Sequence, residues 1–111
     1  MLNEYSFKEA TMDMLRSSIY DDAKFCHDFM IVNADEFETE SIVEIIAVQH
    51  EIQDELSDCL LRVNNRKCGI DEMIMIYTKN AKKMKELRIE IMELFEEAKA
   101  NKKVLEEAKE N

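Results

Sequence analysis

The chain has 111 residues, of which 46% are hydrophobic and 36% are charged, with one glycine and no proline. This length suffices for one domain with a buried core, and the near absence of helix breakers predicts an all-α fold. The formal net charge of −10 disfavours direct binding to nucleic acid or to an anionic membrane surface, because both require basic groups.

Three features of the sequence indicate where in the cell the protein is located. The first ten residues lack the cationic start and apolar run of a secretory signal, and no apolar window is long enough to cross a membrane. The three cysteines, Cys26, Cys59 and Cys68, are odd in number and form no CxxC pair, which argues against a disulfide framework. We therefore expect a soluble, cytoplasmic protein.

The first predicted helix covers residues 7–31. Ser6 and Glu9 have the spacing of a capping box, which places the start near Phe7, and "YDDAK" at 20–24 is a candidate break. The residues predicted to face inward are Met14, Leu15, Ile19, Ala23, Cys26 and Met30.

The second predicted helix covers residues 40–64, after a lapse of periodicity in "VNADEFETES". Asn33 with Glu36, or Thr39 and Ser41, could cap it. Its apolar side repeats at helical spacing and is expected to be buried: Ile42, Ile45, Val48, Ile52, Leu56, Cys59, Leu60 and Val63. A separate arc of the same helix is acidic, with Glu44, Glu51, Asp54, Glu55 and Asp58.

The third predicted helix covers residues 71–109, after the turn "NNRKCG", with Asp71 as its expected cap. A heptad seam runs along it: Tyr77, Met84, Leu87, Ile91, Leu94 and Leu105, interrupted by Asn80 and Asn101. At 1.5 Å per residue the helix would be roughly 55–60 Å long, too long for a compact domain of this size, whose radius of gyration is about 13 Å. Residues 99–111 should therefore either project and pair with another chain or fray.

The uneven charge points to a basic partner or a bound cation. Residues 1–64 carry 15 acidic and 4 basic groups, whereas residues 65–111 carry 10 and 11. The acidic arc has three interpretations: a docking surface for a basic protein, a solvated helix face, or half of a Mg²⁺ site made by Glu51, Glu55 and Asp58, whose i, i+4 and i+7 spacing puts them on one side of the helix.

One resemblance bears on the metal interpretation. "DELSDCLLRV" followed by "GIDEMIMIYTKNAKKMKELR", within residues 51–88, resembles part of the MazG-like all-α nucleotide pyrophosphohydrolases. The resemblance implies that Glu55 and Asp58, as an ExxD pair, bind Mg²⁺ and that Lys79 or Arg88 contacts phosphate. The family's preceding ExxE pair is missing; the nearest substitutes are Asp35 with Glu38, or Glu40 with Glu44.

His27 and His50 lie in no catalytic motif, and a single glycine cannot make a phosphate-binding loop. We therefore expect a three- to four-helix bundle that acts by binding rather than as an enzyme, without a cofactor. It would be a small regulatory or inhibitory protein, of the kind encoded by phages or mobile elements, whose acidic arc docks on a basic, nucleic-acid-binding surface of a partner. The alternatives are the Mg²⁺-dependent pyrophosphohydrolase and a coiled-coil structural adaptor. We also expect a homo-oligomer or a subunit of a complex, because the seam of the third helix could pair with another chain.

Overall fold

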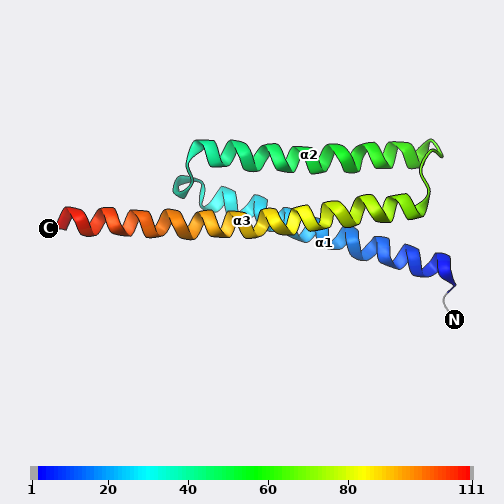
Figure 1. The fold of residues 1–111 in the computed structure, drawn as a ribbon, viewed down its shortest axis with the longest axis horizontal. Coiled ribbons are helices and arrows are strands. Elements are labelled where there is room, and N and C mark those ends of the chain that lie inside the picture. The colour runs from blue at the N-terminus through cyan, green and yellow to red at the C-terminus, as the bar shows by residue number, and fades with distance from the viewer. Residues whose placement is uncertain (1–2, 111) are drawn as a thin grey trace.

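The computed structural model describes residues 3–110 and is all-α in that part of the chain (Figure 1). Its elements are α1 (Glu4–Val32), a short 3-10 helix η1 (Ala34–Glu36), α2 (Thr39–Asn64) and α3 (Ile70–Glu110). The predicted fold class is confirmed, and the predicted helix boundaries are within about three residues of the observed ones.

The start of α1 differs from the prediction. Asn3 is the N-cap, and its Oδ1 accepts a hydrogen bond of 2.8 Å from the backbone N–H of Ser6. Ser6 therefore lies inside the first turn and does not cap the helix. Residues 20–24, the candidate break, are helical throughout, since "YDDAK" contains no residue that removes a backbone hydrogen bond.

The buried side of α1 is formed by Met12, Ile19, Asp22 and Cys26. Met14, predicted to face inward, is 73% exposed. Met12 occupies the core position two turns before Ile19, and a shift of two residues, from Met12 to Met14, turns a side chain by about 200° around the helix. Leu15, Ala23 and Met30 are partly buried, as expected.

Aromatic packing holds the connection between α1 and α2. Asn33 ends α1, and its Nδ2 donates to the carbonyl oxygen of Phe29. Phe37 is buried, with its ring 6.3 Å from Phe29 and 6.1 Å from Phe95 of α3. The N-cap of α2 is Glu38, which makes no side-chain capping bond, so the caps predicted from Asn33, Thr39 and Ser41 are wrong. Burial of Phe37 fixes where the chain turns instead.

The turn between α2 and α3 uses Arg66, not glycine, in the left-handed region (φ 60°). Gly69 keeps a negative φ, and α3 begins directly after it. Asp71, the expected cap, lies within the first turn of α3 and pairs with Lys8 of α1 at 2.8 Å. This pair joins the turn to the start of α1.

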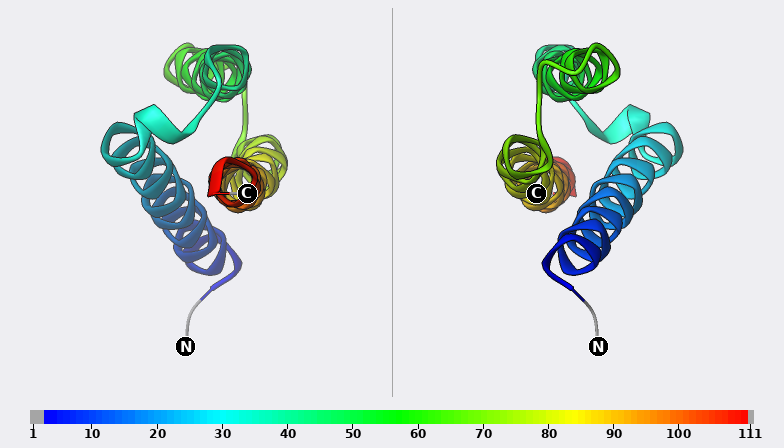
Figure 2. Two further views of the ribbon diagram at one scale, coloured as in Figure 1. Left: turned by 90° about the vertical axis from the view of Figure 1, so that its left-hand side faces the viewer. Right: turned by 90° about the vertical axis from the view of Figure 1, so that its right-hand side faces the viewer.

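Both α1 and α2 pack on α3, and the end-on views show the three helices as the corners of a triangle, with α1 crossing obliquely (Figure 2). The core along α3 includes Met73, Tyr77, Ala81, Met84, Leu87 and Ile91. Four residues of the predicted heptad seam, Tyr77, Met84, Leu87 and Ile91, are thus buried by the chain's own helices, and Leu94 packs on the same core. Within this chain the seam is already filled as far as Leu94.

The last turns of α3 extend beyond the other helices (Figure 1). α3 has 41 residues and α2 has 26, or about 62 Å against 39 Å at 1.5 Å per residue. The radius of gyration is 18.7 Å, and the longest extent is 68 Å. We call Lys99–Lys109 the C-terminal extension; it is helical and projects, with Val104 and Leu105 each 63% exposed.

Candidate interaction surfaces

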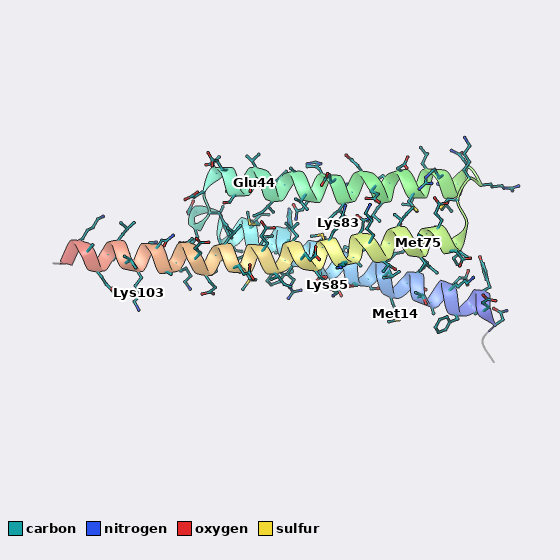
Figure 3. The ribbon with its side chains drawn as sticks, in the orientation of Figure 1. Met14, Glu44, Met75, Lys83, Lys85 and Lys103 are labelled. Atoms are coloured by element: carbon teal, nitrogen blue, oxygen red, sulfur yellow. The ribbon has the colours of Figure 1, made fainter. Side chains whose placement is uncertain are left out.

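The five predicted partner-binding carboxylates all lie on α2. Because α2 is unbroken from Thr39 to Asn64, Glu44 and Asp58 are separated by fourteen residues of one helix, or about 21 Å. Glu44, Glu51 and Asp54 are exposed, and Glu55 is half-buried against α3. Figure 3 labels Glu44 near the start of α2.

Glu55 is held by two lysines of α3. Its carboxylate lies 3.0 Å from Lys79 Nζ and 3.9 Å from Lys83 Nζ. The hydrogen bond from Lys79 is the main reason that the pKa of Glu55 is lowered from its ordinary value of 4.5. Glu55 thus serves the contact between α2 and α3.

Asp58 is engaged in a similar way near the α2–α3 turn. It lies 3.3 Å from Arg62 Nε, and Arg62 Nη1 is 2.8 Å from Glu72 of α3. The bond from Arg62 lowers the pKa of Glu72, and the bond to Glu72 raises the pKa of Arg62. Among residues 3–109, no ion pair joins Glu44, Glu51 or Asp54 to a cation. We call these three residues the open acidic strip.

The proposed magnesium ligands Glu51, Glu55 and Asp58 do not fit a divalent cation. Two lysine ammonium groups already occupy the oxygens of Glu55 and would repel a metal there. Within the described residues, no group of three or more His, Cys, Asp or Glu side chains is arranged to hold a metal ion.

The residues that the resemblance implies for the rest of that site are also placed differently. Glu40 and Glu44 share α2 with Asp58, so they cannot face it across a hairpin. Asp35 lies in η1, which precedes α2, and Glu38 is the N-cap of α2. Lys79 pairs with Glu55, and Arg88 is engaged elsewhere.

Sequence reasoning missed a buried ionic cluster between α1 and α3. The side chain of Asp22 is 8% exposed and lies 3.1 Å from Arg88 Nη1 and 3.4 Å from Lys85 Nζ. Arg88 also stacks over Phe25, with its Cζ 3.8 Å from the ring centroid. A signal was present: Asp22 follows Ile19 by three residues and precedes Cys26 by four, which puts a carboxylate on the buried stripe, and such a group needs cationic partners.

The thiols of Cys26 and Cys68 are not activated as nucleophiles, and both histidines lie on the surface. His27 and His50 are exposed, and His27 Nδ1 lies 3.3 Å from Asp28. Burial, followed by the nearby charge of Asp22, raises the pKa of Cys26 to about 11. Desolvation and a hydrogen bond with Glu72 raise the pKa of the Cys68 thiol to about 11. Both are therefore thiols at neutral pH, and thiols are poor nucleophiles.

A second unpredicted feature is an apolar groove of about 470 Å³ between α1 and α2. We call it the α1–α2 groove. Tyr77 and Met84 of α3 form its floor, Ile19 and Tyr20 belong to the α1 wall, and Leu60 belongs to the α2 wall. Leu60 was predicted to be buried but is 44% exposed, because α1 does not close over this side of α2.

No family model matches the chain, and the searches of curated proteins and of solved structures return no match either. None of the described helices is long and apolar enough to cross a membrane.

Proposed function

We propose that this protein is a small regulatory or inhibitory protein that binds a basic surface of a partner protein through the open acidic strip. The observation that supports this most is the division of the acidic face of α2. Glu55 and Asp58 are used in ion pairs within the chain, whereas Glu44, Glu51 and Asp54 are exposed and form no ion pair with any other residue that the structure describes.

The strip is suited to recognition by its rigidity and its charge. One helix holds all three carboxylates, and Glu44 and Glu51 are seven residues apart, or about 10.5 Å along the axis. Carboxylates at fixed spacing steer a basic partner and fix its register. A partner groove that normally takes nucleic acid would be blocked by such a strip, so inhibition follows from occupancy alone.

We place this activity in the cytoplasm. Cys26, Cys59 and Cys68 are all free thiols, and free thiols persist where the compartment is reducing.

Polylysine, as a basic probe, gives a first test with a charge-matched control. The strip variant carries Glu44→Gln, Glu51→Gln and Asp54→Asn. The control carries Glu86→Gln, Glu90→Gln and Glu93→Gln, which removes three exposed carboxylates from α3. We expect the strip variant to bind polylysine about tenfold more weakly than the control does, with a difference that shrinks at high salt. Equal losses in both variants would mean that only net charge matters and would refute the strip.

The other two candidate functions lack comparable support. The pyrophosphohydrolase would need Glu55 as a metal ligand, and Lys79 and Lys83 hold that carboxylate. The coiled-coil adaptor would need the heptad seam of α3 to be open, but it is covered by α1 and α2 as far as Leu94.

A further inference from the structure

Cys59 and Cys68 lie on the two sides of the turn between α2 and α3 (Figure 1). Cys59 is on the buried side of α2, and its exposed fraction is 0%. Cys68 lies outside both helices, two residues before α3 begins at Ile70, and it is partly exposed. The conformation of the turn therefore decides whether the two side chains meet.

The backbone of this turn carries the chain back over the end of α2. The N–H of Lys67 donates to the carbonyl oxygen of Arg62 at 2.8 Å, and the N–H of Arg66 donates to that of Val63 at 3.0 Å. These two bonds, with Arg66 at φ 60°, form a Schellman motif, which ends a helix and turns the chain out of its axis. The residue that follows the motif, Cys68, is thereby brought beside the last turns of α2.

The side chains of Cys59 and Cys68 belong to one packed cluster, in which Cys59 is fully buried and Cys68 packs against the buried members. The two thiols also interact directly. The pKa of the Cys68 thiol is raised first by desolvation and then by a hydrogen bond with Glu72, and a hydrogen bond with Cys59 adds to both. Cys26 packs in the other cluster of the core. The fold thus brings Cys59 and Cys68 together and keeps Cys26 apart.

A surface cleft gives access to one of these two thiols. The cleft has a volume of about 520 Å³ and lies between α1, which contributes Glu9 and Arg16, and the turn, which contributes Cys68. Cys59 does not line the cleft and has no exposed surface. A small reagent can therefore reach Cys68 directly, whereas Cys59 can be reached only through Cys68.

We propose that Cys59 and Cys68 are a redox pair, which a low-molecular-weight disulfide such as oxidised glutathione converts to an intramolecular disulfide. In the first step Cys68 loses its proton, and its Sγ attacks one sulfur of the reagent, so that one thiol leaves. In the second step Cys59 loses its proton, and its Sγ attacks Cys68 Sγ, so that the second thiol leaves. The two protons pass to the departing sulfurs. The two cysteines are oxidised, and the reagent is reduced to two thiols.

The environment of Cys68 determines the character of this pair. A dithiol resists oxidation when its surroundings stabilise the thiolate, but burial and the carboxylate of Glu72 disfavour the Cys68 thiolate. Little thiolate is present at neutral pH, so the exchange is slow. This slowness sets how long the oxidation takes and leaves the position of its equilibrium unchanged.

The disulfide would join α2 to the turn and close a loop of ten residues, 59–68. Such a bond restricts the unfolded chain and so stabilises the folded one. In a reducing compartment the pair stays in the dithiol form, and a rise in the concentration of small disulfides locks the turn. The open acidic strip contributes no residue to this pair.

Three single variants of the full chain test the order of the steps: Cys26→Ala, Cys59→Ala and Cys68→Ala. Each is incubated in its folded state with excess oxidised glutathione until the products stop changing, and the products are identified by intact mass and peptide mapping. We expect the wild type and Cys26→Ala to lose two hydrogens and to contain a bond between Cys59 and Cys68. Cys59→Ala should stop at a mixed disulfide of Cys68 with glutathione, and Cys68→Ala should form no protein disulfide.

Several products would overturn the proposal. These are a wild type that ends as a glutathione adduct at Cys68, one that forms a bond to Cys26 or to a second chain, and one that does not react. Circular dichroism establishes that the variants are folded. Cys68→Ala changes a partly exposed site and remains informative if the buried replacement Cys59→Ala unfolds the chain.

The Cys26→Ala variant also measures the effect of the bond on stability, because Cys59 and Cys68 are then the only cysteines. We expect its oxidised form to unfold at a Tm higher than that of its reduced form by about 5 to 15 °C, and reduction with dithiothreitol to reverse the shift. An equal or lower Tm in the oxidised form would overturn the proposal, since it would mean that the folded turn does not accommodate the bond.

Discussion

The buried carboxylate of Asp22 provides the sharpest test of what holds α1 on α3. The Asp22 side chain is only 8% exposed, and it has two cationic partners, Arg88 at 3.1 Å and Lys85 at 3.4 Å. Replacing it with asparagine, which has nearly the same shape, keeps the packing and removes the charge. We expect Asp22→Asn to destabilise the protein.

The size of this effect follows from the two ionic hydrogen bonds. A hydrogen bond to a charged group contributes about 1.5–3 kcal/mol, and asparagine still accepts one neutral hydrogen bond from Arg88. The side chains of Arg88 and Lys85 are 42% and 61% exposed, so water compensates for part of the loss. The net cost should be about 1–3 kcal/mol, which for a chain of this length lowers Tm by roughly 4–12 °C.

Thermal and urea unfolding followed by circular dichroism measure this cost, and the adjacent residue supplies the control. Asp21 is exposed, so Asp21→Asn should change the free energy of unfolding by no more than about 0.5 kcal/mol. If the two variants unfold at the same temperature, the Asp22 cluster does not stabilise the packing of α1 on α3, and the reasoning from burial is refuted.

Three further predictions concern the α3 interface. Ile91→Ala removes a fully buried side chain and should cost about 2–5 kcal/mol in urea unfolding, whereas Ile89→Ala, on the exposed side, should cost little. Asn80→Leu should change the free energy of unfolding by no more than about 1.5 kcal/mol, because removal of the partnerless Asn80 Oδ1 offsets the loss of the hydrogen bond from Asn80 Nδ2 to the carbonyl oxygen of Ile76; a larger loss would contradict this. Since the folded-state pKa of Glu55 is lowered, its pairing stabilises the protein above pH 4.5 and is lost as pH falls through the folded value, so Glu55→Gln should flatten the unfolding profile in that acidic range; an unchanged profile would show that the Lys79 pair contributes nothing.

The positions of the helices were predictable because their determinants are local. Hydrophobic periodicity, the missing prolines and the single glycine define helices whose ends lie within about three residues of those predicted. The overlong third helix was also predictable, since nothing from Ile70 to Glu110 interrupts it. The capping residues were not predicted correctly, because Asn3 and the burial of Phe37 set the ends of α1 and α2.

The candidate surfaces depended on how the helices pack, which the sequence does not reveal. An acidic arc on α2 could be read from the spacing of its carboxylates, but only the approach of α3 decides that Lys79 pairs with Glu55 and leaves Glu44, Glu51 and Asp54 open. The heptad of α3 likewise specified an apolar stripe without specifying what covers it.

By itself, the sequence determined that this chain is helical, where each helix runs and which side of it is apolar, because these properties depend on residues three and four apart. Tertiary structure alone decided that α1 and α2 fill the seam of α3, that Asp22 meets Arg88, and that a groove remains between α1 and α2. Those outcomes depend on contacts between residues far apart in the sequence, 66 positions for Asp22 and Arg88 and 24 for Glu55 and Lys79, for which periodicity carries no information.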